Sequence, residues 1–321
     1  MIKFENVSKV YGDGTVAVDS LNVEINQGEF FVLIGPSGSG KTTSLKMINQ
    51  LVPLSDGMIY INGKKIHDYD IYELRWNIGY VLQQIALFPH MTIEQNITVV
   101  PEMKKWSKEK MKKRAYELME MVGLDPHIYA DRKPHQLSGG EQQRVGVIRA
   151  LAADSEIILM DEPFSALDPI SREKLQDDLL HLKNNLKKTT VFVTHDMQEA
   201  LKLADRICIM KDGKVVQVGT PYELIHHPVD EFVQQFVGGK SDRFGEDFQL
   251  KKILVRTEET NVNDHLRVVN VSASLHEVLE KLSEDERLQV EENGKLIGFI
   301  DRRATIQYLS KNVRGRGQSN E

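Results

Sequence analysis

The sequence has a single cysteine, Cys208, among its 321 residues, so no disulfide can form within one chain. One cysteine fits a reducing compartment without establishing it. Long apolar runs are also absent. The longest, such as Phe30–Ile34 and Ile157–Met160, have the length of a strand, whereas a membrane-spanning helix needs about 20 apolar residues. The composition therefore excludes a disulfide-stabilised scaffold and an integral membrane protein.

An excess of positive charge is also absent, since 41 Lys and Arg stand against 47 Asp and Glu, a net charge of −6. Nucleic-acid binding normally needs a basic face, so we expect no nucleic-acid partner. The start of the chain, Met1–Glu5, carries an acid and leads into no long apolar run, so we expect no secretory signal. The 40% hydrophobic and 27% charged residues are typical of a globular protein, and the length suggests two domains.

The first 240 residues alternate apolar runs of strand length with segments of helix length. Continuous apolar strands bounded by turns are typical of a sheet that is covered on both faces. This pattern predicts an α/β fold, with strands at Phe30–Ile34, Ile157–Met160, Thr190–Val193 and Arg206–Met210.

The composition changes at Gly238–Asp242, which reads as a linker. A helical apolar stripe and two short strands joined by a hairpin turn follow, and they predict a small α+β unit. We expect a first domain at residues 1–240, a linker or partial repeat at 241–267, the α+β unit at 268–312 and a flexible tail at 313–321. The elements of the small unit are a helix at Leu275–Leu282, strands at Leu288–Glu291 and Leu296–Ile300, and a short helix at Ala304–Leu309.

The segment Gly35–Thr42 matches the phosphate-binding pattern G-x-x-x-x-G-K-[ST] without deviation. It follows the apolar run Phe30–Ile34 and precedes a segment with helical spacing, which is the context the pattern requires. Backbone N–H groups of such a loop converge on phosphate oxygens at a helix N-terminus. Lys41 is expected to contact the β- and γ-phosphates, and the Thr42 hydroxyl is expected to bind Mg²⁺. The residues expected to hold the nucleotide here are Gly35, Pro36, Ser37, Gly38, Ser39, Gly40, Lys41, Thr42 and Thr43.

Two acids, Asp161 and Glu162, end the apolar run that begins at Ile157. Asp161 is expected to hold Mg²⁺, and Glu162 is placed to act as the general base for an attacking water. A phosphate loop with these acids is still compatible with a kinase, a GTPase or a motor ATPase.

The segment Leu137–Arg144 resembles the signature of ATP-binding cassette (ABC) ATPases, and it lies before the acidic strand, as in that family. The resemblance covers about residues 1–240 and implies a RecA-like core with a β-subdomain and a helical subdomain. It also implies a homodimer in which Ser138, Gly139 and Gly140 contact the nucleotide held by the second copy.

Further positions resemble the family's motifs in the expected order. They are Gln83 of the Q-loop, which contacts Mg²⁺ or the attacking water, Asp168 of the D-loop, His195 of the H-loop, and Tyr11, which stacks on adenine. The resemblance implies that Glu162, His195, Gln83 and Lys41 carry catalysis with ATP and Mg²⁺, and that Thr42, Gln83 and Asp161 hold the metal.

The single uninterrupted cassette points to a transport subunit that docks on separate transmembrane permease subunits at the cytoplasmic face of the cell membrane. Residues Ile85–His90 resemble the groove for the permease, although local burial would also explain their apolar character. The segments Thr42–Leu51 and Asn96–Trp106 closely resemble ATPases of osmoprotectant importers, which move glycine betaine, carnitine or choline and use an extracytoplasmic substrate-binding protein. The alternatives are an importer of another small solute and, from a different class, an ABC ATPase that remodels a macromolecular complex.

Residues from about Val268 to Leu309 resemble one cystathionine-β-synthase-type (CBS) regulatory repeat. Two positions depart from the nucleotide-binding form of that repeat, because Asp301 stands where many have Thr and Ala304 where many have Asp. The unit could bind cyclic di-AMP, contact anionic lipid, sense ionic strength or only support dimerisation. Its basic residues are Arg302, Arg303, Arg314 and Arg316.

Overall fold

The computed structural model describes residues 1–241, 250, 253–254, 267–271, 273, 275–292 and 295–306. Its contacts divide the chain into two compact units, Met1–Gly238 and Gly239–Glu321, and each is described by itself. Among the described residues, no helix has both the length and the apolar character that crossing a bilayer requires.

The first unit is built around a six-stranded sheet with the order β10-β9-β3-β8-β7-β6. All neighbours are parallel except β9 and β10, which form an antiparallel hairpin with Lys211 paired to Lys214. The predicted α/β arrangement is therefore present, and each predicted strand is found within two residues of its bounds. The strands are β3 (Phe30–Ile34), β6 (Ile78–Val81), β7 (Ile157–Asp161), β8 (Thr189–Thr194), β9 (Arg206–Lys211) and β10 (Lys214–Gly219).

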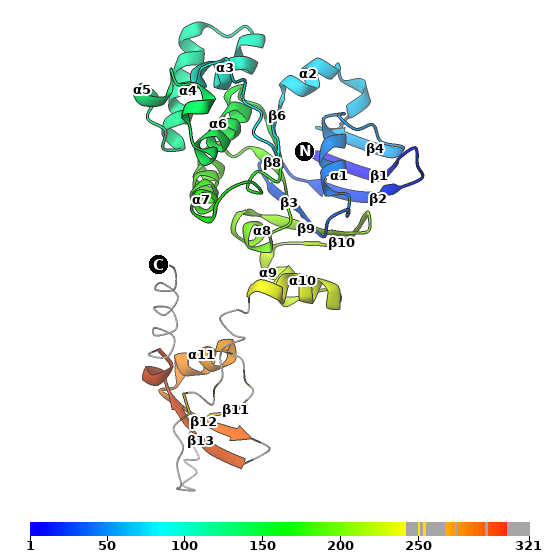
Figure 1. Cartoon of the computed structure of the whole chain (residues 1–321). Coiled ribbons are helices and arrows are strands. Elements are labelled where there is room, and N and C mark those ends of the chain that lie inside the picture. The colour runs from blue at the N-terminus through cyan, green and yellow to red at the C-terminus, as the bar shows by residue number, and fades with distance from the viewer. Residues whose placement is uncertain are drawn as a thin grey trace. The chain divides into compact units, whose positions relative to one another are not determined.

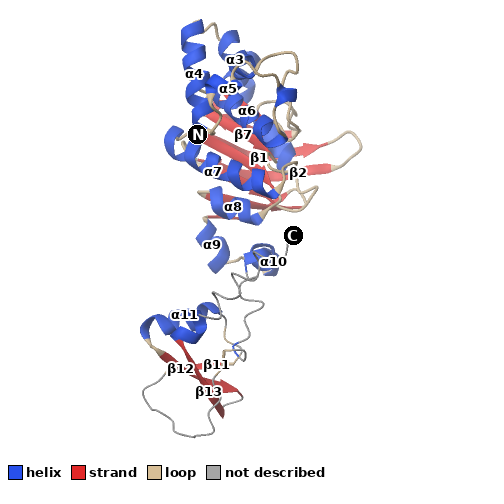
Figure 2. Ribbon diagram, turned by 60° about the vertical axis from the view of Figure 1, so that its left-hand side comes forward, coloured by secondary structure: helices blue, strands red, loops and turns tan. Residues whose placement is uncertain are grey.

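Strand β3 is buried on both faces and separates two cores. Phe30, Val32 and Ile34 point into a core shared with the helices on one side, and Phe31 and Leu33 point into a core on the other side. This alternation follows from the two-residue period of a strand. Figure 2 shows α7 (Pro169–Leu186) and α8 (Met197–Leu203) across one face of the sheet.

A second, antiparallel sheet with the order β2-β1-β4-β5 packs on the opposite core together with α1 (Lys41–Ile48). The lone cysteine, Cys208, is buried in that core, and burial raises the pKa of its thiol to about 12. The second sheet comprises β1 (Ile2–Val10), β2 (Val16–Ile25), β4 (Asp56–Ile61) and β5 (Lys64–Lys65), and a 3-10 turn (Ile66–Asp68) and α2 (Ile71–Trp76) follow it.

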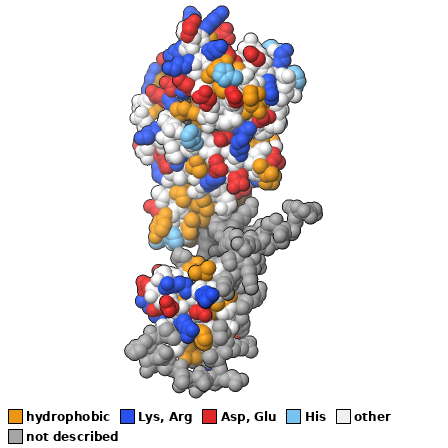
Figure 3. Space-filling model, turned by 90° about the vertical axis from the view of Figure 1, so that its left-hand side faces the viewer, with side chains coloured by type: hydrophobic (Ala, Val, Ile, Leu, Met, Phe, Trp, Pro, Cys, Tyr) orange, Lys and Arg blue, Asp and Glu red, His pale blue; other side chains and the backbone are white. Residues whose placement is uncertain are grey.

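Helices α3 to α6 form a separate group at one end of the first unit, and the antiparallel sheet lies at the other (Figure 1). On the face seen in Figure 3, acidic and basic side chains are interspersed across this unit. The helices of the group are α3 (Ile93–Met103), α4 (Lys108–Met121), α5 (Pro126–Tyr129) and α6 (Gly139–Ala152), with a 3-10 turn at Pro134–Gln136. Two more helices, α9 (Pro221–His226) and α10 (Glu231–Ser241), follow β10.

The chain divides into its two units at the start of the predicted linker Gly238–Asp242, and α10 continues through most of this segment to Ser241. Asp242 and most of the expected linker at 241–267 lie outside the described residues. A helix propagates through a glycine pair at a cost of about 1 kcal/mol per glycine, so glycine alone does not end it.

The second unit contains the predicted helix and both predicted strands. Strand β12 pairs in parallel with β11 and antiparallel with β13, and α11 contributes Val278 and Leu282 to their core. The described elements are β11 (Val268–Asn270), α11 (Leu275–Glu284), β12 (Arg287–Glu292) and β13 (Lys295–Asp301). The tail predicted at 313–321 and the end of the helix predicted at Ala304–Leu309 lie outside the described residues, as do Arg314 and Arg316.

Candidate functional site

Four neighbouring strands end at one edge of the parallel sheet, and each leads directly into a segment singled out from the sequence. Strand β3 leads into the phosphate loop, β6 into Gln83, β7 into Glu162 and β8 into His195. The carboxyl ends of parallel strands are the usual place for a ligand in such sheets. The strand order therefore brings together residues that are far apart in the sequence.

The phosphate loop encloses the ammonium group of Lys41, which is 5% exposed. Its Nζ donates to the carbonyl oxygens of Gly35 (2.9 Å) and Pro36 (2.8 Å) and lies 3.4 Å from the Ser39 hydroxyl. Burial lowers the pKa of Lys41, while the charges of Glu162 and Asp161 act in the opposite direction. No carboxylate of the described residues lies within ion-pair distance of this ammonium, so its positive charge is not neutralised by a neighbouring acid.

Two glycines of the loop have no room for a side chain. A Cβ on Gly40, whose φ is +94°, would lie 2.3 Å from the Ala17 carbonyl oxygen, and a Cβ on Gly35 would lie 2.0 Å from the Met210 carbonyl oxygen. The remaining predicted loop residues form the rim of the loop or the first turn of α1. Pro36, Ser37 and Gly38 are exposed, Ser39 is buried, and Thr42 and Thr43 are half-buried.

Asp161 is 3% exposed and is surrounded by groups that donate to its carboxylate or balance its charge. The Thr42 hydroxyl donates to Oδ1 at 2.7 Å, the Tyr80 hydroxyl lies 3.4 Å from Oδ2, and Lys46 Nζ lies 3.7 Å from Oδ2. Burial, and then the charge of Asp161, raise the pKa of Tyr80, so that its hydroxyl keeps its proton. A hydroxyl beside a carboxylate is a donor set that suits a hard cation such as Mg²⁺.

Glu162 lies between the two other predicted catalytic side chains. Its Oε2 is 3.2 Å from His195 Nδ1 and 3.5 Å from Gln83 Nε2. Its backbone has a φ of +44°, which is uncommon for a residue with a side chain, and its N–H donates to the Val193 carbonyl oxygen at 3.0 Å. The structure therefore brings Glu162, His195 and Gln83 together as the sequence predicted.

Glu199 is a buried acid behind His195 that sequence reasoning missed. It is 6% exposed, it accepts a hydrogen bond from the Thr194 hydroxyl, and burial raises its pKa. With Glu162, His195 and Arg172 it lines a small cavity of about 40 Å³. The available signal was its position in the first turn of α8, three residues after the N-cap Asp196.

The other predicted nucleotide contacts, which are Tyr11, Asp168, Ser138, Gly139 and Gly140, have local partners instead. Tyr11 is 42% exposed beside Lys9, and Asp168 caps the N-terminus of α7 by accepting from the Ser171 N–H at 3.0 Å. Ser138 caps α6, ahead of Gly139 and Gly140. Among the described residues, no hydrogen bond joins Ser138–Gly140 to the phosphate loop.

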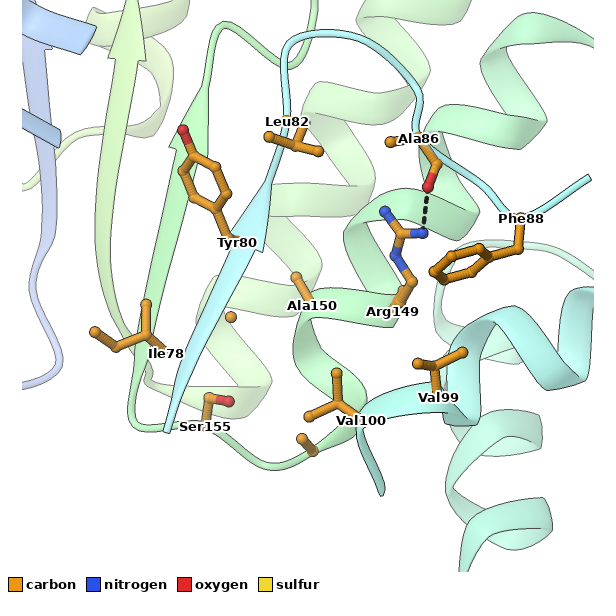
Figure 4. A pocket seen from close by; sticks show the side chains of 12 residues that line it. Ile78, Tyr80, Leu82, Ala86, Phe88, Val99, Val100, Arg149, Ala150 and Ser155 are labelled. Carbon is orange, nitrogen blue, oxygen red and sulfur yellow. Dashed lines mark hydrogen bonds between the residues drawn. The ribbon is translucent and has the colours of Figure 1, made fainter. Parts of the chain in front are cut away.

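An apolar pocket of about 430 Å³ lies between the end of β6 and the helices α3 and α6. Figure 4 shows Phe88, Val99 and Val100 on one side, and the Arg149 guanidinium donating to the Ala86 carbonyl oxygen at 2.6 Å. Burial lowers the pKa of Arg149. The segment predicted as a groove, Ile85–His90, contributes Ala86 and the 41% exposed Phe88 to this pocket, whereas Leu87 packs on the core.

Three features together define a P-loop nucleotide-hydrolysing protein. They are a phosphate loop with a buried lysine, a Thr–Asp pair, and a glutamate between His195 and Gln83. The family model described as "ABC transporter" matches residues 18–165. The glycine betaine/carnitine/choline transport ATP-binding protein OpuCA of Bacillus subtilis is 50% identical over 304 residues, which cover 94% of this chain and 78% of that protein. The osmoprotectant import ATP-binding protein OsmV of Salmonella typhimurium is 47% identical over 94% of this chain and 80% of its own length.

Solved structures agree with these sequence relatives. A dimeric post-hydrolysis state of the ATP-binding cassette MJ0796 bound to ADP and Pi is 40% identical over 69% of this chain and 99% of that chain, with a TM-score of 0.62. CbiO1 from Clostridium perfringens is 28% identical over 75% of this chain and 94% of that chain, with a TM-score of 0.66.

The chain therefore belongs to the ATP-binding subunits of ABC transporters, and it is an ATP-binding ATPase. The resemblance drawn from Leu137–Arg144 and the predicted cassette fold are confirmed. The CBS-type repeat stays a prediction.

Proposed function

We propose that this chain powers the import of a quaternary ammonium osmoprotectant (glycine betaine, carnitine or choline) through separate permease subunits at the cytoplasmic face of the membrane. The observation that carries the proposal is the identity of about half of the residues, along nearly the whole chain, to ATP-binding subunits named for these solutes. An extracytoplasmic substrate-binding protein would deliver the solute.

In the proposed reaction, water attacks the γ-phosphate of ATP in line with the leaving group. Glu162 accepts a proton from that water, and His195 and Gln83, at 3.2 and 3.5 Å, fix its carboxylate. Lys41 holds the phosphates from inside the loop. Thr42, Asp161 and Gln83 would hold Mg²⁺, which neutralises charge on the phosphates when it is bound.

The second half of the site comes from a second copy of the chain in this proposal. Ser138, Gly139 and Gly140 present a hydroxyl and backbone N–H groups at the start of α6, where a helix N-terminus favours an anion. Asp168 would contact the same nucleotide at the dimer interface. Tyr11 would stack on the adenine ring of that nucleotide.

The permease is proposed to dock in the pocket beside Gln83. Apolar walls suit a short helix, and the half-buried Arg149 offers it N–H donors. The pocket adjoins the end of β6, which leads into Gln83, so movement of the docked segment can reach the Glu162 cluster.

For the second unit we propose pairing with the same unit of a second chain, as a regulatory module. Arg302 is not a free surface charge, because its guanidinium donates to the carbonyl oxygens of Leu282, Ser283 and Asp285 at the end of α11. Arg303 is exposed and remains the described candidate for contact with an anionic lipid or cyclic di-AMP.

The deciding experiment measures ATP-driven uptake of labelled betaine, carnitine and choline by vesicles that contain the whole complex. We expect uptake of at least one of them, with none in the Glu162→Gln complex. ATP hydrolysis without uptake of any of the three would redirect the search to another small solute. If the chain does not co-purify with a permease, or if co-purification does not depend on Gln83–Pro89, the remodelling alternative is favoured.

A further inference from the structure

The hydroxyl group of the signature serine is already engaged within its own chain. Ser138 Oγ donates to Glu141 Oε2 at 2.8 Å, and the Ser138 N–H donates to the same oxygen at 2.7 Å. In return, Ser138 Oγ accepts from the Glu141 N–H at 3.3 Å. One carboxylate oxygen therefore takes both donors of Ser138.

The other oxygen of this carboxylate is held from α5. The Tyr129 hydroxyl donates to Glu141 Oε1 at 2.7 Å, and the Arg132 guanidinium lies 4.6 Å from the centre of the Tyr129 ring. Partial burial acts to raise the pKa of Glu141, but the hydrogen bonds from Tyr129 and Ser138 outweigh it and lower the pKa. Glu141 is therefore an anion directly beside the place where a phosphate would bind.

Phosphate oxygens only accept hydrogen bonds, so Ser138 Oγ can donate to a phosphate only by leaving Glu141 Oε2. A carboxylate that followed the hydroxyl would meet the phosphate with like charge. We propose that Tyr129 is a positioning residue for the signature serine. Its hydroxyl holds the Glu141 carboxylate back while the Ser138 hydroxyl turns to the nucleotide of a second copy. This inference rests on the proposed role of Ser138.

The backbone that follows Tyr129 is held in place by hydrogen bonds to the start of α3. The carbonyl oxygens of Ala130 and Arg132 accept from the N–H groups of Glu94 (3.0 Å) and Ile93 (2.8 Å) at the first turn of α3. Helix α3 also contributes two side chains to the pocket proposed for the permease. The segment around Tyr129 is therefore joined to α3, which lines that pocket, and through Glu141 to the signature.

The test compares Tyr129→Phe with the wild type in the full chain assembled with its permease. We expect kcat for ATP hydrolysis to fall about tenfold, because a hydrogen bond to a charged group is lost in the closed dimer. KM and the affinity of the isolated subunit for a fluorescent ATP analogue should not change, since the phosphate loop supplies that binding.

Tyr116→Phe is the matched control. Tyr116 lies on α4, in the same group of helices, and its ring contacts His127 of α5; within the described part of the chain its hydroxyl has no hydrogen-bond partner. The Tyr116→Phe variant should retain the wild-type kcat for ATP hydrolysis. In a Glu141→Gln background, where the ionised carboxylate is absent, adding Tyr129→Phe should change kcat by less than about twofold.

Ser138→Ala distinguishes failure of the positioning role of Tyr129 from failure of the proposed role of Ser138. If it abolishes hydrolysis while Tyr129→Phe behaves like Tyr116→Phe, the positioning role is overturned and the proposed role of Ser138 stands. If Tyr129→Phe lowers kcat equally in the wild-type and Glu141→Gln backgrounds, Tyr129 does not act through Glu141. If Ser138→Ala hydrolyses ATP normally, the signature assignment fails and the inference fails with it.

Discussion

The Thr42 hydroxyl donates a hydrogen bond of 2.7 Å to Asp161 Oδ1, although the two residues are 119 positions apart in the sequence. The contact joins the first turn of α1 to the end of β7. Since the proton of the hydroxyl faces Asp161, its oxygen lone pairs are available to a cation. The pair thus links the phosphate loop to the acidic strand and orients the proposed metal ligand.

Thr42→Val should remove the Mg²⁺-dependent part of ATP binding, because valine keeps the shape of threonine but has no oxygen. We expect the affinity for MgATP to fall about 10- to 100-fold, while the affinity measured in EDTA stays near that of the wild type. Thr42→Ser, which keeps the hydroxyl, is the control. Equal losses with and without Mg²⁺ would contradict a metal-binding role.

Glu162→Gln should abolish steady-state hydrolysis and keep ATP binding, since the amide has the size of the carboxylate but cannot act as a base. The expected fall in kcat is about 10²- to 10⁴-fold. Size-exclusion chromatography with ATP should then show a trapped dimer. The exposed Glu173→Gln on α7 is the control, and near-wild-type turnover in Glu162→Gln would defeat the assignment.

Gly40→Ala should lower the free energy of unfolding by about 1–3 kcal/mol and abolish nucleotide binding. A Cβ there would lie 2.3 Å from the Ala17 carbonyl oxygen, at a φ of +94°. Gly12→Ala is the matched control, because no atom lies within 4 Å of its Cβ position. Thermal unfolding and nucleotide titration measure the two effects, and equal unfolding midpoints for both variants would refute the steric argument.

Glu199→Gln should change how stability depends on pH. Burial raises the pKa of Glu199 in the folded chain, so the folded state keeps this proton at pH values where the unfolded state has lost it. Its contribution to stability is therefore greatest below the usual carboxyl pKa and falls as the pH rises from there through the raised folded pKa.

Glutamine does not titrate, so the stability of Glu199→Gln relative to the wild type should increase across this range. Urea unfolding at a series of pH values measures the difference. Glu173→Gln serves again as the control, and parallel curves for Glu199→Gln and the wild type would contradict the buried-acid explanation.

Much of the cassette could be predicted because its signals are local. The Gly35–Thr42 pattern sits between a strand and a helix, and each flanking element is specified by its own apolar period. Helix α4 also begins at a local signal, the N-cap Ser107, whose side chain accepts from the Lys110 N–H. The helical conformation of the predicted linker Gly238–Asp242 was not foreseen, because the apolar residues of α10 that precede its glycines pack on the core.

The sequence by itself determined the candidate residues for the chemistry and the order in which they occur. Only the tertiary structure decided their partners: Thr42 with Asp161, Glu162 with His195, and Tyr129 with Glu141. The parallel register of β3, β7 and β8 brings the first two pairs together, and packing of α5 against the start of α6 brings the third. A sequence pattern is local, whereas strand order and helix packing are set by burial of side chains distributed over the whole first unit.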